Sequence, residues 1–121
     1  MKPFVELANK LFESREKAHV FHLTIKSHEN HMATQFYYEG ILDVIDNLVE
    51  VWQGKYGMIE DYQFADYNSE TDPIKYFEDL SKFIEMERYN FIPKEDTFLH
   101  NILDESLELL YKTLYKLKYL K

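Results

Sequence analysis

Cysteine is absent from the 121 residues, which excludes disulfides, thiolate metal ligands and thiol nucleophiles. Glycine and proline occur only three times each. So few chain-breaking residues favour long, uninterrupted helices over a fold with many turns. No apolar run reaches the roughly 18 residues that a membrane span needs, so we expect no contact with the bilayer interior.

Basic residues are also in short supply, with 14 Lys and Arg against 22 Asp and Glu and a formal net charge of −8. This balance disfavours nucleic acid as a partner, because binding to phosphates needs clustered Lys and Arg. The first ten residues carry an acid and an amide where a signal peptide would be apolar. We therefore expect a soluble cytoplasmic protein.

Apolar residues make up 45% of the chain, enough for the core of one domain spanning residues 1–121. They recur at helical spacing in four segments, which we expect to be helices over 3–26, 30–53, 73–90 and 94–120. Ser27 or Asn30 is predicted to cap the second segment, and Asp72 followed by Pro73 the third. Four amphipathic helices of this length predict an all-α, antiparallel four-helix bundle.

Residues 54–72 lack helical periodicity and are predicted to form a long crossover loop between the second and third helices. Its central part, residues 56–67, has more aromatic and apolar side chains than a solvated loop needs. These side chains either pack on the bundle or contact a partner protein. They are Tyr56, Met58, Tyr62, Phe64 and Tyr67.

Histidines and acids follow a pattern that suggests a metal site. His19 and His31 are 12 residues apart, Asp46 lies 15 residues beyond His31, and Glu50 is 4 residues further. Imidazole and carboxylate together suit iron, zinc or manganese. Asp46 and Glu50 are one helical turn apart, so both can reach the same ion.

The length of the second helix limits how this site can form. His31 and Asp46 are roughly 22 Å apart along one helix at 1.5 Å per residue, so they cannot bind one ion within a chain. A second subunit in antiparallel, two-fold contact would bring its acids to the histidines and create two equal sites. The motif therefore predicts a homo-oligomer, at least a dimer.

The spacing resembles the ferroxidase motif of the Dps proteins, small ferritin-like proteins of bacteria. The matching residues are His19 after Ala18, His31, Asp46 in the run `DVID`, and Glu50. The resemblance implies a ferritin-like bundle that oxidises Fe(II), with two His from one subunit and the Asp and Glu from its two-fold mate. It implies no catalytic residue beyond these ligands and no organic cofactor.

The chain also departs from the Dps pattern. Val20 stands where that family usually has Trp, Gln35 where it often has an acid, and Val51 where it usually has Arg. The chain is shorter and lacks a basic N-terminal extension. It is equally similar to small ferritin-like proteins encoded by bacteriophages, and for such a protein the phage virion is a further location.

Simpler interpretations exist for every residue of the motif. His19 and His31 are also typical of hydrogen-bonded or surface histidines, and His22 of a surface residue or an additional ligand. Asp46 and Glu50 extend a solvated acidic stripe that includes Glu39 and Asp43. The alternative function is therefore a non-catalytic helical bundle with a structural or interaction role and a degenerate metal site.

Overall fold

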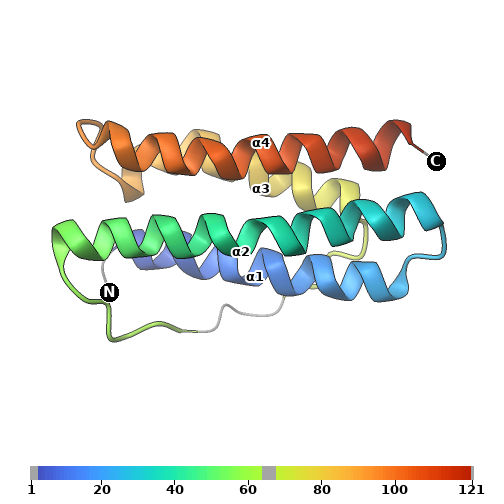
Figure 1. Cartoon of the computed structure of the whole chain (residues 1–121), viewed down its shortest axis with the longest axis horizontal. Coiled ribbons are helices and arrows are strands. Elements are labelled where there is room, and N and C mark those ends of the chain that lie inside the picture. The colour runs from blue at the N-terminus through green and yellow to red at the C-terminus, as the bar shows by residue number, and fades with distance from the viewer. Residues whose placement is uncertain (1–2, 64–67, 121) are drawn as a thin grey trace.

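The computed structural model describes residues 3–63 and 68–120 and contains four helices (Figure 1). They are α1 (Pro3–Thr24), α2 (His28–Tyr56), α3 (Pro73–Phe91) and α4 (Thr97–Tyr119). The all-α, four-helix architecture predicted from the sequence is confirmed.

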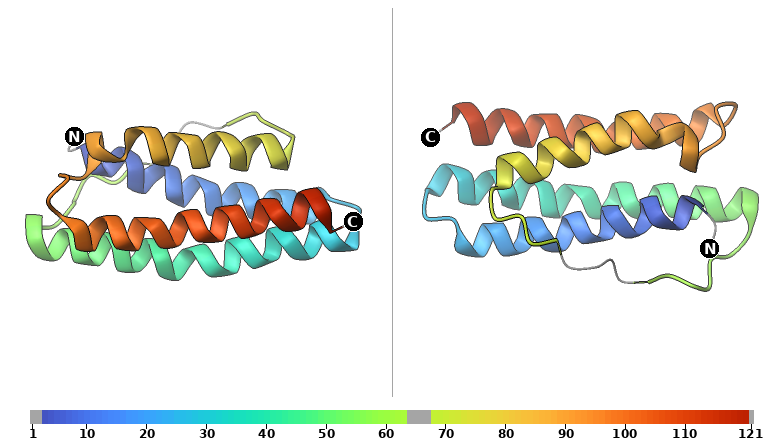
Figure 2. Two further views of the ribbon diagram at one scale, coloured as in Figure 1. Left: turned by 90° about the horizontal axis from the view of Figure 1, so that it is seen from above. Right: turned by 180° about the vertical axis from the view of Figure 1, so that it is seen from behind.

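The helices form two antiparallel pairs, α1 with α2 and α3 with α4, that pack on one another (Figures 1 and 2). Each helix has two neighbours, because α1 also packs on α3, and α2 also packs on α4. The helices α2 and α3 run parallel and lie diagonally across the bundle, as do α1 and α4 (Figures 1 and 2). The end of α2 and the start of α3, which residues 57–72 connect, therefore lie toward opposite ends of the bundle (Figure 1).

The junction between α1 and α2 is tighter than the sequence suggests. The first helix ends at Thr24 instead of residue 26, and α2 begins at His28 instead of residue 30. Ser27 is the N-cap, and its hydroxyl accepts a hydrogen bond from the backbone N–H of Asn30. This cap satisfies one otherwise unpaired amide of the first turn, which places the helix start two residues earlier.

The second helix ends at Tyr56 and not near residue 53, because Gly54 does not interrupt it. Gly54 faces open space and stays helical. Gly57 has φ of +105°, a conformation that L side chains rarely adopt, and its N–H donates to the Gln53 carbonyl at 2.8 Å. The helix therefore stops at the glycine whose backbone leaves the helical region.

The predicted start of the third helix is confirmed, since Asp72 accepts a hydrogen bond from the Ile74 N–H at 3.0 Å. The fourth helix begins at Thr97 and not at residue 94. Asp96 occupies its N-cap position without a side-chain cap, because its buried carboxylate accepts hydrogen bonds from Lys55 and Tyr56 of α2 instead. Asp96 thus joins the end of α2 to the start of α4.

The core is aliphatic along α4 and rich in aromatic rings between the other helices. Phe4 stacks on Trp52 with ring centroids 4.7 Å apart, and Phe77 packs against Tyr37 at 4.9 Å. Tyr37 is fully buried while Tyr38 is only half-buried, so the inward face of α2 passes through Tyr37. Leucines that recur at helical spacing along α4 are buried and supply its share of the core: Leu99, Leu103, Leu110, Leu114 and Leu117.

The long connection is held against α1 at two places. Lys17 is buried, and its Nζ donates to the carbonyls of Asn68 at 2.8 Å and Glu70 at 2.7 Å. Nearer the end of α2, the Tyr62 ring meets the Phe12 ring edge-on. A buried ammonium group needs such hydrogen bonds, so Lys17 ties the approach to α3 to the middle of α1.

The hydroxyls of Ser14 and Tyr37 form a buried hydrogen-bonded pair, and we expect their removal to lower the free energy of unfolding by different amounts. Ser14 donates to the Leu11 carbonyl at 2.6 Å, so Tyr37 donates to Ser14 at 2.7 Å. Ser14→Ala should cost about 1–3 kcal/mol because it leaves a buried hydroxyl unpaired, and Tyr37→Phe only about 1 kcal/mol. Urea unfolding of both variants checks this order, and a larger loss for Tyr37→Phe would contradict it.

We also expect Asp96 to make the bundle sensitive to acid. Hydrogen bonds from Lys55 and then Tyr56 hold the pKa of Asp96 below its ordinary value. Its contribution to stability is therefore present above the unfolded-state pKa, near 3.9, and is lost as the pH falls through the folded-state pKa. Asp96→Asn should lower the unfolding free energy at pH 7, and its difference from wild type should shrink below about pH 4.

Urea unfolding at pH 7 and pH 3 measures this difference. Asp79→Asn is the matched control, because Asp79 forms an exposed pair with Lys75. Such pairs contribute little, so the control should change stability by at most about 1 kcal/mol. An equal loss for Asp96→Asn at both pH values would contradict the role assigned to the carboxylate.

Candidate metal centre

Three histidines gather where α1 ends and α2 begins. His19 and His22 lie one turn apart near the end of α1, and His31 is in the first turn of α2. The ring of His22 stacks on that of His31 with centroids 3.5 Å apart and lies 6.3 Å from that of His19. We call these three residues the histidine cluster.

His22 and His31 hold one another through their backbones. The Nδ1 atom of His22 lies 2.9 Å from the His31 carbonyl oxygen, and Nδ1 of His31 lies 2.8 Å from the His22 carbonyl oxygen. A carbonyl can only accept, so both Nδ1 atoms carry the proton. In the neutral rings the lone pair is then on Nε2, the nitrogen left free for a further partner.

His19 has a different environment. It is exposed and stacks on Tyr38 of α2 with ring centroids 4.6 Å apart. Tyr38 also meets His22 edge-on at 5.3 Å. The structure therefore places His22, and not His19, directly against His31, with His19 and Tyr38 at the edge of the cluster.

The predicted acidic ligands lie further along α2. Glu39, Asp43, Asp46 and Glu50 are all exposed on α2, and we call them the acidic stripe. Asp46 and Glu50 also continue a row with Tyr38 and Leu42, in which each residue is one turn beyond the previous one. The row begins beside His19 and ends in two adjacent carboxylates.

Within one chain, these acids and the histidine cluster do not come together. Among the residues that the structure describes, no group of three or more His, Cys, Asp or Glu side chains is placed to hold a metal ion. This agrees with the helix length, which separates His31 from Asp46 by roughly 22 Å. A site that uses His19, His31, Asp46 and Glu50 therefore requires a second protomer.

The sequence pattern gave no reason to favour His22. Its spacing from His31 matches no ligand motif, and a surface position was the simpler interpretation. His22 is nevertheless not a simple surface residue. The short junction between α1 and α2 brings its ring against that of His31 and leaves both side chains half-buried. A hydrogen bond to a backbone carbonyl across a helix junction cannot be recognised from the types of the residues involved, because every residue has a backbone carbonyl.

His100 shows how a histidine with a structural role is bonded in this bundle. It is buried, its Nδ1 accepts from Arg88 Nε at 3.1 Å, and its Nε2 lies 3.1 Å from the Pro93 carbonyl oxygen. Arg88 also pairs with Asp104 at 2.8 Å. Both ring nitrogens of His100 are thus occupied by protein, which leaves none for a ligand.

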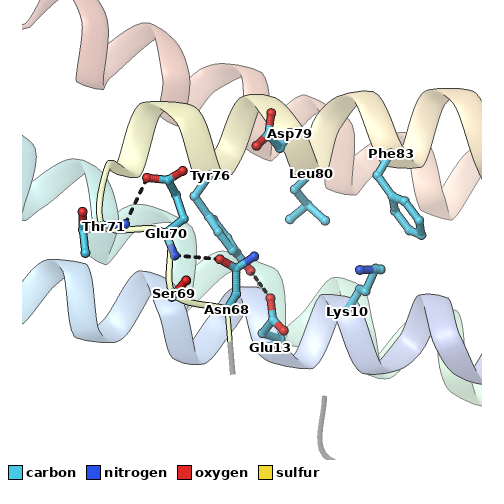
Figure 3. Close-up of a pocket in the computed structure, with 10 residues that line it drawn as sticks. All are labelled: Lys10, Glu13, Asn68, Ser69, Glu70, Thr71, Tyr76, Asp79, Leu80 and Phe83. Atoms are coloured by element: carbon cyan, nitrogen blue, oxygen red, sulfur yellow. Dashed lines mark hydrogen bonds between the residues drawn. The ribbon is translucent and has the colours of Figure 1, made fainter. Parts of the chain in front are cut away.

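A polar pocket of about 500 Å³ lies between α1, α3 and residues 68–71 (Figure 3). The polar groups that line it largely pair with each other. Tyr76 donates to Glu13 at 2.9 Å, and the Glu70 carboxylate accepts from the N–H groups of Thr71 and Asp72. Burial, followed by the charge of Glu13, raises the pKa of the Tyr76 hydroxyl far above its ordinary value. We therefore assign these contacts to packing of the crossover connection.

Only part of the aromatic segment 56–67 packs on the bundle where the structure describes it, and Ile59 is the one buried residue among 56–63. Ile59 is buried, and its N–H and the Tyr62 hydroxyl both donate to the side-chain oxygen of Gln53 at 3.0 Å. Met58 is 72% exposed and makes no such contact with the core. Phe64 and Tyr67 lie outside the described residues.

The chain matches a family of unknown function (DUF5856) over residues 22–117. It belongs to that family. The matched region contains His22, His31, Asp46 and Glu50 but begins after His19. No curated protein and no solved structure matches the chain. In the described part of this family member, no helix is both long and apolar enough to cross a membrane.

Proposed function

We propose that this protein is a Dps-like, iron-binding homo-oligomer that oxidises Fe²⁺ at a site shared by two protomers. His19 and His31 of one protomer bind the iron together with Asp46 and Glu50 of the other. The observation that carries the proposal is the row Tyr38, Leu42, Asp46 and Glu50, which starts under His19 and ends in the paired acids. A two-fold axis near Leu42 would place each histidine cluster opposite the partner's acids.

The chemistry of the four side chains fits iron as the substrate. Neutral imidazoles favour Fe²⁺, and carboxylates stabilise Fe³⁺ once it forms. Two Fe²⁺ ions supply the two electrons that reduce one peroxide, with two protons, to two waters. Gln35 donates to Glu39 at 3.0 Å where Dps proteins often have an acid, so fewer carboxylates surround a second ion.

The path of the chain also supports the ferritin-like assignment. Ferritin-like bundles contain one long crossover between their second and third helices. Here residues 57–72 make such a connection between the diagonal helices α2 and α3. We place the protein in the cytoplasm, or in the virion if it is encoded by a phage, as part of the same proposal.

Mixing two inactive variants tests whether the site is shared. His19→Ala/His31→Ala lacks the imidazoles, and Asp46→Ala/Glu50→Ala lacks the acids. We expect each to lose peroxide-dependent formation of ferric iron, measured by absorbance. After subunit exchange, a mixed dimer has one site with all four ligands. The mixture should regain about a quarter of the wild-type rate, because half of the dimers are mixed and each has one intact site of two.

Two further variants serve as controls. His28→Ala and Asp43→Ala remove an exposed histidine and an exposed acid from α2 without touching the proposed ligands, so both should oxidise iron at the wild-type rate. If the two inactive variants never complement each other after exchange, the shared site is wrong. Wild-type activity in the Asp46→Ala/Glu50→Ala variant would exclude these acids as ligands.

A non-catalytic interaction module is the second candidate, favoured by the outer face of α4. Tyr111, Tyr115 and Tyr119 follow one another at one-turn intervals and are 47%, 56% and 71% exposed. Tyrosine is enriched where proteins meet other proteins, since it offers a large ring with a polar tip. Under this interpretation the row of Tyr111, Tyr115 and Tyr119 contacts a partner protein, and metal is absent or structural.

Chelator treatment separates the two candidates. For an interaction module, we expect melting temperature and oligomer size to be the same with and without EDTA, measured by calorimetry and light scattering. For the shared iron site, removing the metal should lower both, because an ion that binds only the assembled form stabilises it. A metal-dependent oligomer would count against the interaction module.

A further inference from the structure

Arg15 is a half-buried cation that has no strong acceptor among the residues that the structure describes. Its side chain is 35% exposed, and its Nε atom is buried without a hydrogen-bond partner. Its salt bridge joins Nη1 to Glu16, the next residue along α1, at 3.4 Å, and the Glu16 side chain is 72% exposed. A long contact with an exposed acid contributes little. The guanidinium is thus partly removed from water, and its charge is poorly compensated.

Two other half-buried cations show how the bundle usually compensates such a charge. Arg88 binds Asp104 at 2.8 Å, and Lys118, whose side chain is as exposed as that of Arg15, binds Glu78 at 2.9 Å. Both pairs join α3 to α4. Within the described residues, Arg15 makes no such pair with another helix. A carboxylate that pairs fully with Arg15 would therefore belong to a second molecule.

Arg15 lies on the face of α1 that also carries His19 and His22. The three residues follow one another at intervals of four and three, so they form one row along the helix. His19 stacks on Tyr38 of α2. Because α1 and α2 are antiparallel, the turn before His19 on α1 is level with the turn after Tyr38 on α2. Arg15 is therefore level with Leu42, the residue near the two-fold axis proposed above.

The charges on this face are complementary across such an axis. Arg15 is the one permanent cation in the two rows, and Asp46 and Glu50 are the acids, beyond Leu42. In a second copy turned about Leu42, the α2 row runs in the opposite direction, so its Asp46 comes level with His19 of the first copy. Arg15 is then one turn, roughly 5.4 Å, from that level, and its long side chain can span this distance.

We propose that Arg15 donates to Asp46 of a second copy, so that two guanidinium–carboxylate contacts hold the two-fold interface. The inference rests on the dimer proposed above but not on its iron. One oxygen of each Asp46 accepts from the guanidinium, and the other stays available to the metal. Arg15 is thus a positioning residue, which fixes the carboxylate before an ion binds. It offsets one of the four charges of the acidic stripe, so an ion still strengthens the dimer.

Exchanging the two charges tests the contact in the full chain. Arg15→Asp sets two acids against each other at both contacts of a dimer, and Asp46→Arg sets two guanidinium groups against each other, so each variant alone should be monomeric. An equimolar mixture should form mixed dimers, because each contact then pairs an acid with a base. Sedimentation velocity in EDTA measures this. Variants that are folded by circular dichroism but stay monomeric when mixed would overturn the proposal.

Removing the guanidinium should weaken the dimer. Arg15→Ala should raise the dissociation constant in EDTA by about tenfold or more, since each dimer loses two charge-assisted contacts. Arg15→Lys should recover part of the loss, because it keeps the charge but not the forked geometry. Lys10→Ala is the matched control, because Lys10 lies over the Phe83 ring of α3, and it should dimerise as wild type does.

Two results would contradict the contact directly. One is an unchanged dissociation constant in Arg15→Ala. The other is a wild-type chain that stays monomeric in EDTA at every concentration, because the contact uses no metal.

Iron oxidation separates this inference from the proposed function. If the exchanged variants form mixed dimers but the wild type oxidises no Fe²⁺, the Arg15 contact stands and the iron site is wrong. If the wild type oxidises Fe²⁺, and Arg15→Ala both dimerises and oxidises iron as wild type does, the contact is wrong and the iron site stands.

Discussion

The short junction between α1 and α2 is the constraint on which the candidate chemistry depends. Three residues, 25–27, reverse the chain, and the Ser27 cap starts α2 immediately. The two helices must then run antiparallel in contact along their length. His22 meets His31 for this reason, and His19 reaches Tyr38 across the same interface. A longer loop would leave the three histidines on independent helix ends.

Much of the fold could be predicted from the sequence because it depends on local signals. Helical periodicity, the caps at Ser27 and Asp72, and the leucine pattern of α4 each depend on residues that are close together in the sequence. One error arose where a distant partner decides, because Lys55 and Tyr56 take the carboxylate of Asp96 away from α4. The other was local, since only the backbone conformation of Gly57 shows that Gly54 does not end α2.

The candidate site divides in the same way. The separation of His31 from Asp46 followed from helix geometry alone, and with it the need for a second protomer in any site that joins them. The pairing of His22 with His31 could not be predicted, because it depends on backbone carbonyls at a junction whose length was misjudged by two residues at each end. Residue spacing identifies candidate ligands but not which nitrogen of each is free.

Charge links the proposed metal and the proposed dimer. The acidic stripe places four exposed carboxylates along α2 in a chain of net charge −8. A two-fold axis near Leu42 would bring two such stripes close together, and like charges in contact oppose assembly. Neutral histidines cannot offset this repulsion, whereas a divalent cation held between His31 and the partner's acids would. If the shared site exists, ion binding and dimerisation are therefore one coupled equilibrium, and each strengthens the other by the same free energy.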